Sequence, residues 1–226
     1  MKKILFGTLA LSSLLLFSCN KDDGPGEEPV SEVYLNTTAG STWQYEVIDN
    51  TGTDPVQNYT LTSTNRDTTA DGQSYHVYEN SIEVNEYHRK SGNDYYAFQP
   101  MPLELNSTNI ANLYLKAGAT VNSSWSLTAP VDFSGFSFSV KITHTLVGKG
   151  LTKTVNGTTY NNVMDVKTDI GLQGLPPGTV TLTTDIHEFY APGYGLIERN
   201  ARANIDFLGT TETMNVTTRL KTATLL

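Results

Sequence analysis

The stretch that most constrains the fold runs over residues 136–147, where apolar and polar side chains alternate. Phe136, Phe138, Val140 and Ile142 begin one face, while serine, lysine and threonine occupy the other. A period of two is that of a β-strand, and one apolar face with one polar face is typical of an antiparallel sheet. We therefore expect this strand to bury its apolar face, either in a packed core or along a cavity.

The same alternation recurs along the chain between clusters of turn residues. We expect further strands at residues 43–47, 56–63, 74–80, 82–90, 95–98, 164–170, 180–189, 196–207 and 212–220. Asn156-Gly157 predicts a type I′ hairpin turn, because both residues tolerate a positive φ. No strand–helix–strand spacing is present. The sequence predicts an all-β, mainly antiparallel fold, a curved open barrel or a sandwich of about ten strands with at most one or two short helices.

The least strand-like segment is residues 103–115. Asn106 is suited to capping a helix, and Ile110, Leu113 and Tyr114 have the i, i+3, i+4 spacing of one helical face. We expect a short helix here.

Composition limits the possible partners and cross-links. The formal net charge is -8, and no run of Lys or Arg occurs beyond the first residues, so nucleic-acid binding is disfavoured. An acidic surface is also repelled by anionic membranes. The chain has one cysteine, which excludes an internal disulfide.

That cysteine, Cys19, follows a basic start and an apolar run over residues 4–17, which is too short to span a bilayer but suits a signal peptide. Leu16-Phe17-Ser18-Cys19 resembles the bacterial lipobox, whose cysteine is acylated and becomes the mature N-terminus. An ordinary secretory signal is the alternative. We expect a signal peptide at 1–18, a lipidated tether at 19–32 and a single β-rich domain at 33–226. Membrane attachment would then be through the N-terminal lipid anchor.

Lys21-Asp22-Asp23, behind the cysteine, resembles the export signal of Bacteroidota-type surface lipoproteins; a solvating charge run is the alternative. The resemblance implies a lipid-anchored protein of the outer membrane, exposed at the cell surface or facing the periplasm.

A second resemblance lies in Tyr190-Ala191-Pro192-Gly193-Tyr194-Gly195-Leu196-Ile197-Glu198, which also reads physically as a tight turn between strands. The segment is similar to one in uncharacterised β-rich envelope proteins of Bacteroidota type. Some of these look like the half-open barrels of lipoprotein carriers. That resemblance implies a cavity for a lipid or other hydrophobic ligand, lined by Phe136, Phe138, Val140 and Ile142 and bounded by the apolar loop 171–178.

Catalytic and metal-binding motifs are not evident in the sequence. The four histidines show no metal-ligand spacing, and His76 and His88, on neighbouring expected strands, lack a third ligand. His144 lies on an apolar strand face and is expected to be a hydrogen-bonded core histidine. There is no nucleophile motif and no phosphate-binding loop. We expect no enzymatic activity and no cofactor. A hydrolase is the minor alternative.

Tyrosines suggest an alternative kind of binding site. Tyr87, Tyr95 and Tyr96 surround one expected hairpin, and exposed tyrosines favour glycan or protein binding. Strand propensity alone also explains them. The sequence thus predicts a non-catalytic binding module for a hydrophobic ligand, with a glycan- or envelope-protein-binding module around a filled core as the alternative.

Overall fold

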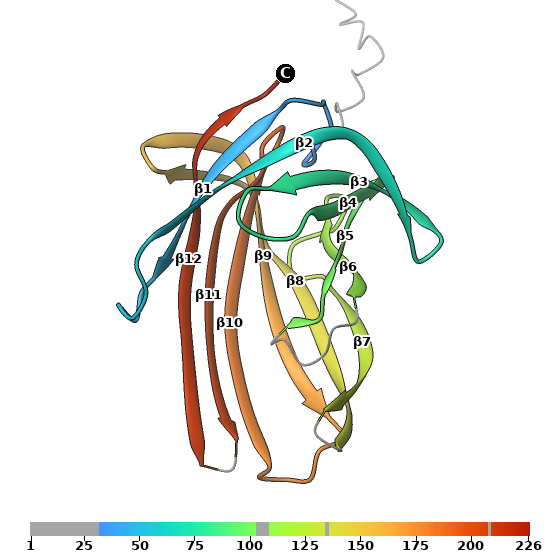
Figure 1. Cartoon of the computed structure of the whole chain (residues 1–226), viewed down its shortest axis with the longest axis vertical. Coiled ribbons are helices and arrows are strands. Elements are labelled where there is room, and N and C mark those ends of the chain that lie inside the picture. The colour runs from blue at the N-terminus through green and yellow to red at the C-terminus, as the bar shows by residue number, and fades with distance from the viewer. Residues whose placement is uncertain (1–31, 103–108, 134–135, 208) are drawn as a thin grey trace, which may run out of the picture. The chain divides into compact units, whose positions relative to one another are not determined.

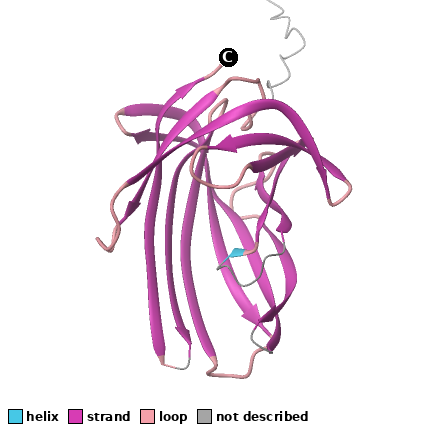
Figure 2. Cartoon of the chain, viewed as in Figure 1, coloured by secondary structure: helices cyan, strands magenta, loops and turns pink. Residues whose placement is uncertain are grey.

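The chain folds into one antiparallel β-sheet that curls into a nearly closed barrel (Figures 1 and 2). The computed structural model describes residues 32–102, 109–133, 136–207 and 209–226. The expected signal peptide, the tether up to Ser31 with Cys19, and Asn106 lie outside these residues. The all-β, antiparallel fold class is confirmed, with twelve strands in the described part where about ten were expected.

The strands cover most of the described chain. Their bounds are β1 Thr42–Asp49, β2 Gln57–Ala70, β3 Gln73–Asn80, β4 Glu86–Ser91, β5 Asp94–Pro100, β6 Asn109–Lys116, β7 Ser124–Phe133, β8 Phe136–Val155, β9 Thr158–Gln173, β10 Val180–Ala191, β11 Gly195–Phe207 and β12 Thr210–Thr224.

The strands follow an up-and-down order that returns on itself. Neighbours run β6-β5-β4-β3-β2-β1-β12-β11-β10-β9-β8-β7, so the first and last strands pair and the free edges are β6 and β7. In Figure 1 the long strands β9 to β12 form one wall, and β1 to β3 cross over its upper end. The sheet and its three apolar clusters lie within the compact unit Glu32–Leu226, which therefore contains the interactions needed to fold alone.

Turn residues account for the connections. Asn156 and Gly157 have φ of 47° and 81° and join Val155 to Thr158 in the β8–β9 register, which confirms the predicted hairpin. The segment from Pro192 to Gly195 is a tight β10–β11 turn, as expected. Gly195 there has φ of 73°, and an added Cβ would lie 3.3 Å from the Tyr34 carbonyl oxygen.

The predicted helix at 103–115 is wrong for its described part. Ile110, Leu113 and Tyr114 lie in strand β6, which pairs with β5. Ile110 and Tyr114 are buried because β6 completes the barrel wall there. Helical spacing over so short a run does not outweigh the ladder that an adjacent strand offers. Among the described residues, no helix is long and apolar enough to cross a membrane.

The alternation in β8 is confirmed. Phe138, Val140, Ile142 and Leu146 are buried, whereas Ser137 on the other face is exposed. The first three belong to an apolar cluster built mainly by β7 to β11. This cluster is named the apolar core; its buried members are Met101, Ile110, Ala129, Val131, Phe138, Val140, Ile142, Ile170, Ile186 and Ala201.

Side chains close the barrel between the free edges β6 and β7. Trp125 on β7 donates from Nε1 to the Leu113 carbonyl oxygen on β6 at 2.6 Å. Nε2 of His144 on β8 lies 2.9 Å from Oδ1 of Asn112 on β6. The contacts of Trp125 with Leu113 and of His144 with Asn112, which we call the seam, hold the two edges together without a backbone ladder. They also cover edge strands whose unpaired backbone groups could otherwise pair with other chains.

His144 is the buried polar centre of the seam. Its Nδ1 lies 2.8 Å from the Thr168 hydroxyl, and it is 2% exposed. Because the Asn112 oxygen only accepts, Nε2 carries the proton and Nδ1 accepts from Thr168. Burial lowers the pKa of His144 from 6.5 to about 4. His144 is thus the core histidine expected from its place on the strand, and it is neutral at pH 7.

We expect acid to destabilise the Glu32–Leu226 unit partly through His144. The unfolded chain takes up a proton near pH 6.5, but the folded chain does so only near pH 4, so stability falls as the pH drops through this window. Between pH 7 and 4.5, the free energy of unfolding in urea should fall by about 2 to 3 kcal/mol more in the wild type than in His144→Gln. Equal losses in the two proteins would contradict this assignment.

Candidate binding cavity

A cavity of about 610 Å³ lies inside the barrel. Its lining residues come from β1 to β6, from β10 to β12 and from the segments beside them. Most of the tyrosines face it, together with Trp43 and Phe98. The lining tyrosines are Tyr34, Tyr45, Tyr59, Tyr78, Tyr87, Tyr114, Tyr190 and Tyr194. We name this space the aromatic cavity.

Ring contacts extend from one wall of the barrel to the other. The Tyr78 ring on β3 lies 5.4 Å from that of His88 on β4, and His88 lies 5.7 Å from Tyr114 on β6. Tyr114 in turn lies 5.4 Å from Tyr190 on β10, on the opposite wall. Edge-to-face and tilted pairs at these separations are favourable. The rings therefore give the cavity a fixed aromatic wall.

Two carboxylates lie among these rings. Glu86 Oε1 accepts from Asn80 Nδ2 at 3.1 Å, and its Oε2 lies 3.1 Å from His88 Nε2. Glu188 accepts from the Tyr190 hydroxyl at 3.2 Å and lies 3.5 Å from Nε of Arg199. Each carboxylate keeps part of its hydrogen-bonding capacity, since an ionised carboxylate offers about four acceptor sites.

The environment keeps the tyrosines neutral. Burial raises the pKa of Tyr78, and the Glu86 carboxylate raises it further. Burial also raises the pKa of Tyr114 and Tyr190, with a smaller contribution from Glu188 in each. The phenols therefore remain protonated and present uncharged rings.

Two buried polar atoms of lining residues have no hydrogen-bond partner in the described structure. They are Nε1 of Trp43, a residue that is 3% exposed, and Nδ1 of His88. Buried polar groups in folded proteins are nearly always paired, and an unpaired one costs about 1 to 3 kcal/mol. Neither atom has accessible surface toward the cavity, so both are costs of packing in the wall behind it.

The apolar residues predicted to bind a ligand lie elsewhere. Phe138, Val140 and Ile142 pack in the apolar core, at most 9% exposed, and do not line the aromatic cavity. Phe136 begins β8, and its side chain lies outside the described part. The expected loop 171–178 is partly wrong, because residues 171–173 continue strand β9 in the β8–β9 ladder; Leu172 in that strand and Leu175 beyond it pack against the same core. Of the two placements that the sequence left open for this strand, the structure has the packed core.

The three tyrosines of the β4–β5 hairpin have different surroundings. Tyr87 is half-buried and lines the cavity. Tyr96 is half-buried, with the Arg89 guanidinium 4.0 Å from its ring centre. Tyr95 is fully buried, and its hydroxyl accepts from the Tyr34 amide at 3.1 Å. The expected surface position of Tyr95 is therefore wrong, because the segment before β1 packs over it.

The sequence interpretation missed most of the cavity wall. Tyr190, Tyr194 and Leu196 line the cavity, although the sequence predicts only a tight turn between strands for residues 190–198. Tyr114 lines it from a segment for which the sequence predicts a helix. Trp43 and Tyr45, on one face of the first expected strand, gave the available signal, since large aromatic side chains on a strand's inner face can line a barrel interior.

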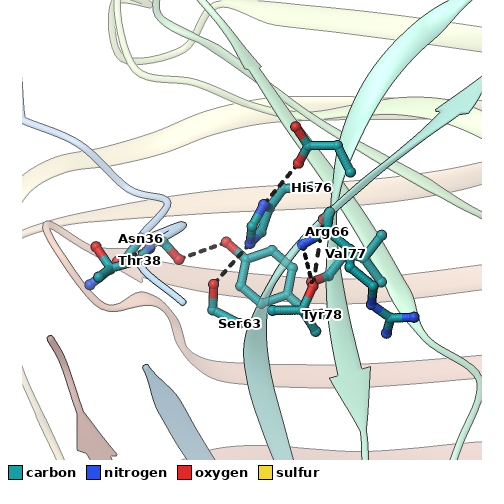
Figure 3. Close-up of polar contacts among 9 residues, drawn as sticks. Asn36, Thr38, Ser63, Arg66, His76, Val77 and Tyr78 are labelled. Carbon is teal, nitrogen blue, oxygen red and sulfur yellow. Dashed lines mark hydrogen bonds and ion pairs between the residues drawn. The ribbon is translucent and has the colours of Figure 1, made fainter. Parts of the chain in front are cut away.

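A hydrogen-bonded chain with the connectivity of a serine-hydrolase triad lies on the β2–β3 hairpin. The Ser63 hydroxyl lies 2.9 Å from Nε2 of His76, whose Nδ1 lies 3.0 Å from Oδ1 of Asp67. Figure 3 shows these contacts beside Tyr78, whose hydroxyl donates to the Asn36 carbonyl oxygen. An irregularity in the register between Ser63 and Asp67 places both side chains against one histidine.

The surroundings of Ser63 favour a structural role. A nucleophile must be reached by its substrate, but Ser63 is 1% exposed. Its amide donates to the Ser41 carbonyl oxygen, and its own carbonyl oxygen accepts from the Gly40 amide. The chain of hydrogen bonds therefore fixes the β2 irregularity and the segment before β1 against the sheet.

We expect Ser63→Ala to lower the free energy of unfolding by about 1 to 3 kcal/mol, because Nε2 of His76 loses its partner in a mostly buried position. Ser74→Ala, an exposed serine on the adjacent strand, should change it by less than about 0.5 kcal/mol. Urea unfolding checks both values. Equal effects would show that the hydrogen bond does not contribute.

Metal binding finds no support in the described residues, which hold no group of three His, Cys, Asp or Glu side chains arranged around an ion. His76 and His88 are register partners across β3 and β4. Each is directed to a carboxylate instead, His76 to Asp67 and His88 to Glu86.

Comparison with known proteins bears on the fold and not on a ligand or a reaction. No family model and no curated protein matches the sequence. A presumed lipoprotein from Parabacteroides distasonis ATCC 8503 has a similar structure, with a TM-score of 0.52 and 15% identity over 85% of this chain and 99% of that one. A presumed exported protein with a YmcC-like fold from Bacteroides fragilis NCTC 9343 has a TM-score of 0.49 and 10% identity over the same shares. The chain thus shares its fold with a β-rich protein of Bacteroidota, in line with the resemblance seen in its sequence.

Proposed function

We propose that the protein is a lipid-anchored, non-catalytic binding protein of the cell envelope that holds a small ligand in the aromatic cavity. The observation that carries the proposal is the cavity itself, about 610 Å³ and lined by aromatic rings with a few carboxylates. Ligand sites typically measure about 300 to 1,000 Å³ and combine apolar walls with few polar groups.

The cavity wall favours an amphipathic ligand over a bare acyl chain. An acyl chain would bury the Glu86 and Glu188 carboxylates of the cavity wall without new partners. Such burial is costly. A ligand with both a flat or apolar part and polar groups would give these carboxylates partners. A module that binds only through its surface has less support, because the structure has a cavity of about 610 Å³ beside its packed clusters.

The anchoring part of the proposal rests on the lipobox-like residues that end at Cys19. Two or more acyl chains on one cysteine give stable membrane attachment. The acidic chain offers no basic patch for binding anionic lipids, so the lipid would supply the attachment. The Lys21-Asp22-Asp23 signal favours the outer membrane and its outer face.

We expect Cys19→Ala to abolish palmitate incorporation and to move the protein from the membrane fraction to the soluble fraction. Ser18→Ala is the matched control, because it keeps a small residue before the cysteine. Metabolic labelling and fractionation of cells expressing each variant provide the readout. Membrane retention of the Cys19→Ala protein would contradict lipid anchoring.

We expect the Glu32–Leu226 unit to bind the neutral dye N-phenyl-1-naphthylamine at one saturable site. Val47→Trp should raise the dissociation constant roughly tenfold or more, because Val47 lines the cavity and an indole there occupies ligand volume. The readout is dye fluorescence in a titration.

Ile48→Trp is the matched control for this prediction. It adds the same side chain one residue along β1, where the side chain points to the other face of the sheet. Equal loss of dye binding in both variants, or no dye binding in the wild type, would contradict a ligand site in the aromatic cavity.

A further inference from the structure

The charged residues that line the aromatic cavity are mostly acidic. They are Glu83, Glu86 and Glu188 against Arg199, with His88 as a further titratable group. Arg199 is paired with Glu188, Nε to Oε1 at 3.5 Å. Within the described lining, Glu83 and Glu86 therefore face no lysine or arginine, and the cavity carries an excess of negative charge.

Glu86 is placed to act on a ligand. Its side chain is about one-third exposed, and its neighbours Asn80 and His88 leave part of its acceptor capacity open. Burial is the main cause of the raised pKa of Tyr45, Tyr59 and Tyr78, and the charge of Glu86 raises the pKa of each further. The carboxylate thus lies among the rings and acts on them through a poorly screened interior.

The rings add to this negative field. An aromatic ring has a negative face, and cations within about 6 Å of the ring centre are attracted to it. Half-buried rings of the lining, such as Tyr59, Tyr87 and Phe98, are partly open to the cavity space. Aromatic walls combined with a carboxylate are typical of sites that hold amine and quaternary ammonium groups.

We propose that the aromatic cavity binds a small organic cation, an amine or quaternary ammonium compound. The inference rests on the proposed binding function of the cavity and names its ligand class. Glu86 provides the opposite charge, and the surrounding rings provide cation–π contacts.

The test compares two probes of the same shape and different charge with the Glu32–Leu226 unit by isothermal titration calorimetry. The probes are acetylcholine and its neutral carbon analogue, 3,3-dimethylbutyl acetate. We expect acetylcholine to bind roughly tenfold more tightly or better. Glu86→Gln should remove most of this difference, while Glu46→Gln, on β1 and outside the lining, should retain it.

The outcomes separate this inference from the proposed function. Equal binding of the two probes, a difference that Glu86→Gln does not change, or tighter binding of glucose would overturn the cation inference. If neither probe binds but N-phenyl-1-naphthylamine does, the cation inference fails and the binding cavity stands. If the dye also fails to bind, the proposed function fails as well.

Discussion

The interior of this barrel must be filled from the sheet itself, because no helix packs inside it among the described residues. A barrel of about eight strands is just wide enough for its own side chains to fill, and wider barrels leave space. Here twelve strands curl until their edges nearly meet. Mostly aliphatic side chains, mainly from β7 to β11, fill one region as the apolar core, while β1 to β6 and the end of β10 supply the large aromatic residues around a cavity. The division of the interior follows from which strands carry tyrosine and which carry valine and isoleucine.

At the seam, the barrel is closed by side chains and not by backbone pairing. A backbone ladder between β6 and β7 would complete the barrel, but Trp125, His144 and Asn112 hold the edges by side-chain contacts instead. Asn112 also lines the aromatic cavity, so the residue that receives the His144 hydrogen bond belongs to the ligand-facing wall. Closure of the barrel and the shape of the cavity therefore depend on the same few side chains.

The sequence predicted the strands well because alternation and turn chemistry are local. The Phe138 to Leu146 face and the Asn156-Gly157 turn were correct for that reason. The sequence predicts no strand over β7 and a helix over most of β6, because helical spacing in a short run competes with strand pairing that depends on distant residues. A cavity was expected, but its lining could not be predicted, because its rings come from six or more strands and meet only when β1 pairs with β12. Phe138 and Ile142 belong to the strand with the clearest apolar alternation in the sequence. In the fold they pack in the apolar core instead of facing open space.

The most direct test of a divided interior is a crystal structure of the Glu32–Leu226 unit soaked with 4-bromobenzyl alcohol, with the bromine located by anomalous scattering. We expect a bromine site beside Tyr59 and Tyr87, the half-buried tyrosines of the aromatic cavity, and none beside Phe138, Val140 and Ile142. A bromine site within the apolar core, or an interior in which side chains fill the space between those tyrosines, would contradict a divided interior.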